Sequence, residues 1–126
     1  MLTVLVCLLV WTKSWAEEST KEDPSQTDMN LSSINYAEKA ERELNAVYKK
    51  LMKKISRKGK PKLRTAQNAW LEYRKKQCEF NTLASSDGSA YSMVLSDCHA
   101  YLAIQQTKIL KQQLECEEGD LSCGSQ

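Results

Sequence analysis

Apolar residues recur every three or four positions through the first half of the chain, starting near residue 30. This spacing places them on one face of an α-helix, because a helix turns once every 3.6 residues. We predict a helix over residues 30–56 whose buried stripe is Leu31, Ile34, Ala37, Ala40, Leu44, Val47, Leu51 and Ile55. Its other side is expected to face water, because it carries Glu38, Lys39, Glu41, Arg42 and Glu43.

A second helix is predicted directly after a turn. Gly59 suits the C-cap of the first helix, and Pro61 suits the first turn of the next. We expect this helix over residues 61–83, with an apolar face formed by Leu63, Ala66, Trp70, Tyr73 and Phe80.

A third helix is predicted after the turn-forming segment SSDGS at residues 85–89. It should cover residues 90–115, with apolar positions at Val94, Cys98, Tyr101, Leu102, Ile109 and Leu114. No stretch shows the sustained alternation of a strand. The predicted fold is therefore all-α, an antiparallel three-helix bundle-like domain over residues 29–115.

The first 28 residues are expected to lie outside this domain. The apolar run at residues 2–11 is about ten residues long, whereas roughly 20 would be needed to cross a bilayer. With small residues at Ser14 and Ala16, the run predicts a secretory signal peptide over residues 1–16, and no transmembrane anchor after cleavage. Residues 17–28 contain no large apolar side chain and predict a flexible leader.

Cysteines remain in the mature chain at four positions, Cys78, Cys98, Cys116 and Cys123. An even number in a short exported chain predicts disulfides, and three pairings are possible. We favour Cys78 with Cys98 and Cys116 with Cys123, because neighbours in sequence can pair without rearranging the helices. The first bridge would clamp the second and third helices near their turn and contribute on the order of 3 kcal/mol. The second would close a small loop in a tail over residues 116–126.

The charge distribution is uneven although the net charge is only +2. Residues 49–64 hold nine basic side chains and no acid, and we call them the basic block. Such a block can attract anionic surfaces, or it can be a solvated helix end and turn. Nucleic acid is not predicted as a partner, because the signal peptide directs the chain out of the cell.

No enzyme, metal or cofactor pattern is found in the sequence. The single histidine, His99, adjoins Cys98 and is expected at the surface, and there is no CxxC pair to hold a metal. Neither a glycine-rich phosphate loop nor a pair of acids at apolar positions is present. We therefore expect a protein that acts without catalysis.

Three segments carry a resemblance to a known family. They are ERELNAVYKKLMKKI at residues 41–55, LRTAQNAWLEYRKKQCEF at 63–80 and GSAYSMVLSDCHAYL at 88–102. Together they resemble the N-terminal domain of LprI-type lysozyme inhibitors, which are small exported bacterial proteins. The matching positions are Leu44, Asn45, Tyr48, Leu63, Ala66, Gln67, Trp70, Arg74, Cys78, Gly88, Ser89 and Cys98.

The sequence departs from the family pattern in two respects. Residues 17–77 lack the earlier cysteine pair that members often carry. Gln106 and Ile109 stand where the last helix tends to carry an Arg and a Glu. The motif residues of the second helix are expected to be structural, with Trp70 and Tyr73 at the helix interface and Gln67 and Arg74 in polar contacts.

The resemblance implies a periplasmic or secreted protein that inhibits a lysozyme, or binds another peptidoglycan-active protein. Lysozyme cleaves with two carboxylates in a cleft, so an inhibitor can act by filling that cleft. Two surfaces could do so. One is the hairpin tip, formed by Ser85, Ser86, Asp87, Gly88 and Ser89, and the other is the basic turn at residues 57–62, with Arg57, Lys58 and Lys60. The alternative function is binding of an anionic envelope polymer or lipid headgroups through the basic block.

Overall fold

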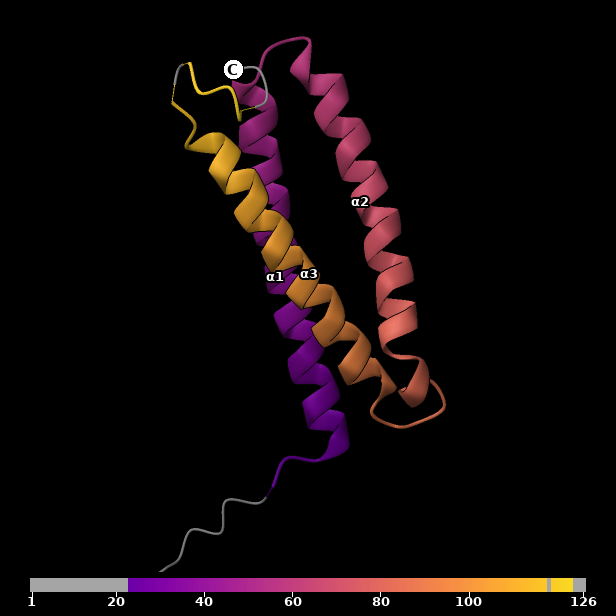
Figure 1. Cartoon of the computed structure of the whole chain (residues 1–126). Helices are drawn as coiled ribbons and strands as arrows, with labels where there is room; N and C mark the ends of the chain where they lie inside the picture. Colours follow the sequence, from indigo (N-terminus) through magenta and orange to yellow (C-terminus); the bar gives the residue numbers. More distant parts are fainter. Residues whose placement is uncertain (1–22, 118, 124–126) are drawn as a thin grey trace, which may run out of the picture.

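The computed structural model describes residues 23–117 and 119–123 as three long helices and one short one. They are α1 (Gln26–Lys54), α2 (Gly59–Asn81), the 3-10 helix η1 (Leu83–Ser85) and α3 (Tyr91–Leu114). Consecutive long helices run in opposite directions (Figure 1). The part of the chain described here contains no strand, and the predicted all-α, three-helix fold class is confirmed.

Helix α1 begins at Gln26, earlier than the predicted residue 30. The Ser25 side chain accepts a hydrogen bond from the backbone N–H of Asp28, and the Asp28 carboxylate accepts one from the backbone N–H of Ser25. This capping box satisfies backbone donors that would otherwise be unpaired at the start of the helix. The last three residues of the predicted leader are therefore helical. The signal peptide and residues 17–22 lie outside the described part.

The junction between α1 and α2 differs from the prediction at Gly59. The C-cap of α1 is Ile55, which turns to an extended conformation and is buried. Gly59 is instead the first residue of α2, and its backbone N–H donates to the Ser56 carbonyl oxygen at 3.0 Å. Helix α1 therefore ends at a buried isoleucine, and no glycine caps it. Pro61 lies in the first turn of α2, as predicted.

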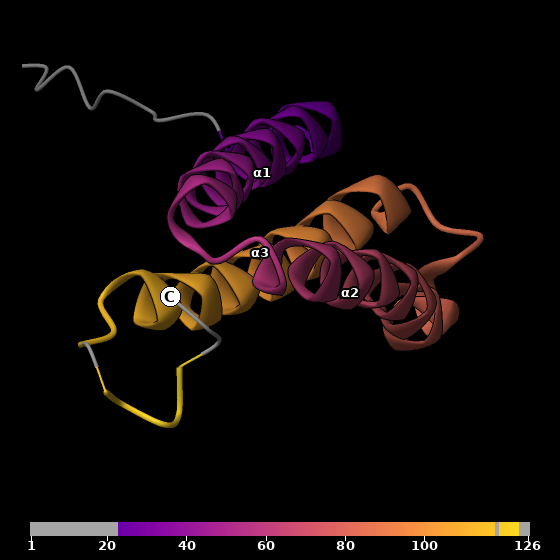
Figure 2. The ribbon, with the colours of Figure 1, turned by 90° about the horizontal axis from the view of Figure 1, so that it is seen from above.

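The buried core lies mainly between α1 and α3, which run in the same direction along most of their lengths. At one end Asn30 Nδ2 donates to the Ser89 carbonyl oxygen at 3.2 Å, and at the other Lys54 Nζ donates to the Leu114 carbonyl oxygen at 2.6 Å. Helix α3 runs between the other two helices (Figure 2). It contacts both, and its contact with α1 is far more extensive than its contact with α2. The buried apolar side chains of the cluster are Ala40, Leu44, Val47, Leu51, Ile55, Ala100, Ala103 and Leu110.

The predicted apolar faces are only partly correct. In α1 the stripe is buried from Ala40 to Ile55, whereas Leu31 is exposed. In α3 the buried residues are Ala100, Ala103, Thr107 and Leu110, while the predicted Tyr101 and Ile109 are exposed. Tyr101 and Ile109 are therefore not part of the buried cluster between α1 and α3.

Helix α2 contributes little to the core. Its buried residues are Gln67 and Cys78, and Leu63 and Trp70 pack against the cluster from its edge. Tyr73 and Phe80 were predicted on the interface and are exposed, Phe80 by 74%. Because α1 and α3 bury their stripes against each other, one side of α2 has no partner among the described helices.

Two disulfides join the cysteines as predicted. Cys78 of α2 pairs with Cys98 of α3, with a Cα–Cα distance of 5.7 Å. Cys116 pairs with Cys123, with a Cα–Cα distance of 6.0 Å. Among the described residues, no helix combines the length and the apolar character needed to cross a membrane.

Candidate binding surfaces

A polar junction connects the three long helices near their middle. Arg74 of α2 forms an ion pair with Glu41 of α1, and its guanidinium carbon lies 4.8 Å from the centroid of the Trp70 ring. His99 of α3 is half-buried close to both charges. Burial and the positive charge of Arg74 lower the pKa of His99, and Glu41 opposes this in part. Glu41 and His99, both predicted at the surface, are partly exposed and lie beside Arg74 of another helix.

A second polar contact joins α2 to α3. Gln106 Nε2 donates to Gln67 Oε1 at 3.1 Å, and the Gln67 side chain is buried. A buried amide without a hydrogen-bond partner would destabilise the fold. The Gln106 side chain supplies such a partner to the buried Gln67 amide. Gln106 thus forms a contact between α2 and α3.

The remaining motif residues do not gather into one site. Leu44 is completely buried, and Tyr48 packs against the core cluster from outside. Asn45 is exposed on α1, and Ala66 is exposed on α2. No single pocket contains the residues that carry the family resemblance; they are distributed over the scaffold.

The hairpin tip, residues 85–89, connects η1 to α3 and protrudes at the lower end of the molecule in Figure 1. Ser85 is half-buried, and Ser86, Asp87, Gly88 and Ser89 are exposed. Successive backbone turns hold the loop, with the Gly88 N–H donating to the Ser85 carbonyl oxygen at 2.9 Å and the Tyr91 N–H to the Gly88 carbonyl oxygen at 3.1 Å. The Cys78–Cys98 disulfide closes its base.

The basic turn lies at the opposite end of α2. Arg57 and Lys58 are exposed, and Lys60 is partly exposed in the first turn of α2. Helix α2 has 23 residues, and at 1.5 Å per residue it separates the two surfaces by about 35 Å. The structure therefore does not combine the two candidate surfaces into one site.

A groove that the sequence did not predict lies beside the basic turn. It encloses about 660 Å³ between the end of α1, the start of α2 and the second half of α3. Its lining is predominantly apolar and includes Leu63, Ala66 and Ile109. One residue in the sequence points to this groove. Ile109 is apolar, yet it lies outside the face of α3 that packs against α1.

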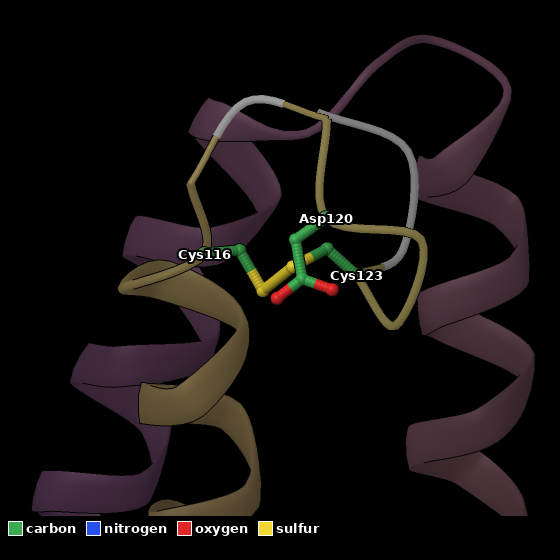
Figure 3. Close-up of side chains that lie close together, drawn as sticks. All are labelled: Cys116, Asp120 and Cys123. Atoms are coloured by element: carbon green, nitrogen blue, oxygen red, sulfur yellow. A yellow bond between two sulfur atoms is a disulfide. The ribbon is translucent and has the colours of Figure 1, made fainter.

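The tail brings Cys116, Asp120 and Cys123 together (Figure 3). Both sulfur atoms are used in the disulfide, so they are not available as thiolate ligands. The Asp120 carboxylate accepts hydrogen bonds from the Ser122 N–H and hydroxyl at 2.8 and 2.7 Å, which lower its pKa. This arrangement is a disulfide-closed turn and gives no support to a metal site.

Comparison with known proteins identifies a family for this chain. The model of the family described as "Lysozyme inhibitor LprI" matches residues 16–110, three-quarters of the chain. The chain belongs to the lysozyme inhibitor LprI family. An uncharacterized protein of Rhizobium meliloti (strain 1021) is 27% identical over 128 residues, covering 91% of this chain and 92% of the relative. No solved structure matches the chain significantly.

The LprI match covers most of the described fold but not the tail disulfide. The Cys78–Cys98 disulfide, the polar junction and the hairpin tip all lie inside the matched residues. The Cys116–Cys123 loop lies beyond them. The matched residues thus include α1, α2 and most of α3, and the tail disulfide lies outside them.

Proposed function

We propose that this protein inhibits a lysozyme by binding to it outside the cytoplasm. Membership of the lysozyme inhibitor LprI family carries this proposal. Two disulfides fit an exported protein, because disulfides persist in oxidising compartments. A periplasmic or secreted location would bring the protein to the peptidoglycan on which lysozymes act.

The proposed mode of action is binding without catalysis. All four cysteines that the structure describes are in disulfides, so none of them offers a nucleophilic thiolate. His99 is half-buried beside the Arg74–Glu41 pair, in surroundings that lower its pKa. These observations support a role in which the protein obstructs its target.

The hairpin tip is the surface that we propose for the target. It is exposed and narrow, and its small polar side chains can enter a cleft and form hydrogen bonds there. The disulfide at its base and the backbone hydrogen bonds within it restrain the loop. A preorganised loop loses less conformational entropy on binding, which favours affinity.

The basic turn is the alternative surface for the same function. Its positive side chains would complement the catalytic carboxylates in a lysozyme cleft. Common lysozymes are cationic overall, however, and like charges slow the encounter of two proteins. The separation of about 35 Å along α2 allows the two surfaces to be tested independently.

The experiment measures inhibition of cell-wall lysis by lysozymes of several classes, with the purified mature protein. Ser86→Trp adds bulk at the tip, and Asn68→Trp adds the same side chain on the exposed surface of α2. We expect Ser86→Trp to weaken inhibition at least tenfold and Asn68→Trp to change it less than twofold. Lys58→Glu combined with Lys60→Glu tests the basic turn.

Each alternative result has a defined meaning. If the unaltered protein inhibits none of the lysozymes at large molar excess, the proposed function is wrong. If Ser86→Trp inhibits normally while the Lys58→Glu, Lys60→Glu variant does not, the function stands and the target binds at the basic turn. Helical circular dichroism of every variant checks that the fold is intact.

A further inference from the structure

The groove beside the basic turn has the composition of a small-molecule site. Its floor includes Leu51, Ile55 and Leu110, all of which are buried in the core cluster. Leu63 and Ala66 of α2 form one wall, and Ile109 of α3 lies on the other. Ligand pockets in proteins usually enclose about 300–1,000 Å³ and are mostly apolar, and the groove, at about 660 Å³, falls within that range.

The groove exists because α2 is not packed closely against α1. The two helices meet through the Arg74–Glu41 pair near their middle, and toward the basic turn α2 contacts the core only from its edge. Ile109 lies on the groove wall and is 53% exposed. A ligand that covers this apolar side chain removes it from water, and this contributes favourably to the free energy of binding.

The charges at the groove are all of one sign. Lys58 and Lys62 line it, and no acidic residue does. Neither lysine forms an ion pair with any residue in the described part of the chain. Arg57 and Lys60 adjoin them in sequence, so the rim of an apolar groove carries several positive charges, none of which forms an ion pair with a described residue.

We propose that this groove binds a medium-chain fatty acid. The single alkyl chain would lie between Leu63 and Ile109, and the carboxylate would pair with Lys58 and Lys62 at the rim. A second copy of this chain would bring the same positive rim to the site and be repelled. An extended peptide would bury backbone polar groups against apolar side chains, where few partners exist for them.

The proposal predicts two separable contributions to affinity. Burial of the alkyl chain should tighten binding by up to about fourfold for each methylene that enters the groove. The carboxylate should add a contribution that weakens at high salt, because the lysines lie at a solvent-exposed rim. A diffuse attraction to the basic block would show the salt dependence without the dependence on chain length.

Calorimetric titration of the mature protein with octanoate, decanoate and laurate tests the proposal. The titrations are made at pH 8 and below the micelle concentration. Dodecyltrimethylammonium has the same alkyl chain as laurate with the opposite charge. We expect one laurate per chain, tighter binding than decanoate and octanoate, and binding of the cation at least tenfold weaker than that of laurate.

Three variants locate the site. Lys58→Glu combined with Lys62→Glu should weaken laurate binding at least tenfold. Lys49→Glu combined with Lys50→Glu makes the same charge change at exposed positions of α1 outside the groove, and should change binding less than twofold. Ala66→Phe fills the groove from an exposed position of α2 and should also weaken binding at least tenfold.

The proposal is overturned by any of three results. Equal binding of laurate and dodecyltrimethylammonium would show that the rim does not select an anion. Equal losses in the two charge variants would show that the attraction belongs to the whole basic block. Unchanged binding in the Ala66→Phe variant, with its helical circular dichroism intact, would place the alkyl chain elsewhere.

Discussion

Arg74 of α2 forms an ion pair with Glu41 of α1, and the same guanidinium lies over the ring of Trp70. The Arg74 side chain is only 16% exposed, whereas the exposed Arg42–Glu38 pair on α1 has side chains 71% and 61% exposed. Partial burial reduces screening by water and salt, so the Arg74 pair should stabilise the protein more. The pair connects α2 to α1, and α2 contributes few apolar side chains to the core.

Replacing Arg74 should therefore destabilise the protein more than replacing Arg42. We expect Arg74→Met to lower the free energy of unfolding by about 1–3 kcal/mol, because the charged hydrogen bond and the contact with Trp70 are both lost. Arg42→Met, the matched control, should change it by less than about 0.5 kcal/mol. Urea unfolding followed by circular dichroism measures both values, and equal losses would contradict this account.

The two disulfides should differ in their contributions. Cys78–Cys98 joins two helices across 20 residues of sequence, and replacing both cysteines by alanine should cost about 3 kcal/mol in the chain-entropy model. Cys116–Cys123 spans seven residues in a tail whose described residues are not part of the buried cluster. Its removal should change the free energy of unfolding by less than about 0.5 kcal/mol.

Thermal unfolding of the two double variants, with the disulfide-intact protein as reference, measures this difference. A loss on removing the tail disulfide as large as that on removing Cys78–Cys98 would mean that the tail folds together with the three helices. That result would contradict the expectation that the tail lies outside the helical domain.

The stability of the protein should fall between pH 7.5 and pH 5.5 because of His99. The pKa of His99 is lowered in the folded state by burial and by Arg74, whereas in the unfolded chain it should be about 6.5. The unfolded chain therefore binds more protons in this range. The contribution of neutral His99 is fully present above about pH 6.5 and is lost as the pH falls toward the lowered folded pKa.

Urea unfolding at several pH values tests this prediction, with His99→Gln as the control. His99 is the only histidine in the chain, so the variant should show a flatter dependence between pH 7.5 and 5.5. An equally steep dependence in the variant would show that another group is responsible. A rise in stability on acidification would mean that the attraction of Glu41 exceeds the effects of burial and Arg74.

The sequence by itself was sufficient to predict the three helices, the fold class and the pairing of the cysteines. The spacing of Ala40, Leu44, Val47 and Leu51 reflects the local geometry of a helix, which does not depend on its partners. The prediction that each cysteine pairs with the next cysteine along the chain also needed no knowledge of how the helices pack. The Cys78–Cys98 and Cys116–Cys123 disulfides follow that rule.

Only the tertiary structure decided which faces are buried and where a groove remains. Tyr73, Phe80 and Ile109 fit a helical apolar stripe, yet they are exposed, because α1 and α3 bury their small and branched residues against each other and leave α2 at the edge. Glu41 was predicted on the polar face of its helix, and only the tertiary structure shows that Arg74 of another helix pairs with it. Periodicity shows which residues share a face, but the competition among three helices for one small core determines which face is covered.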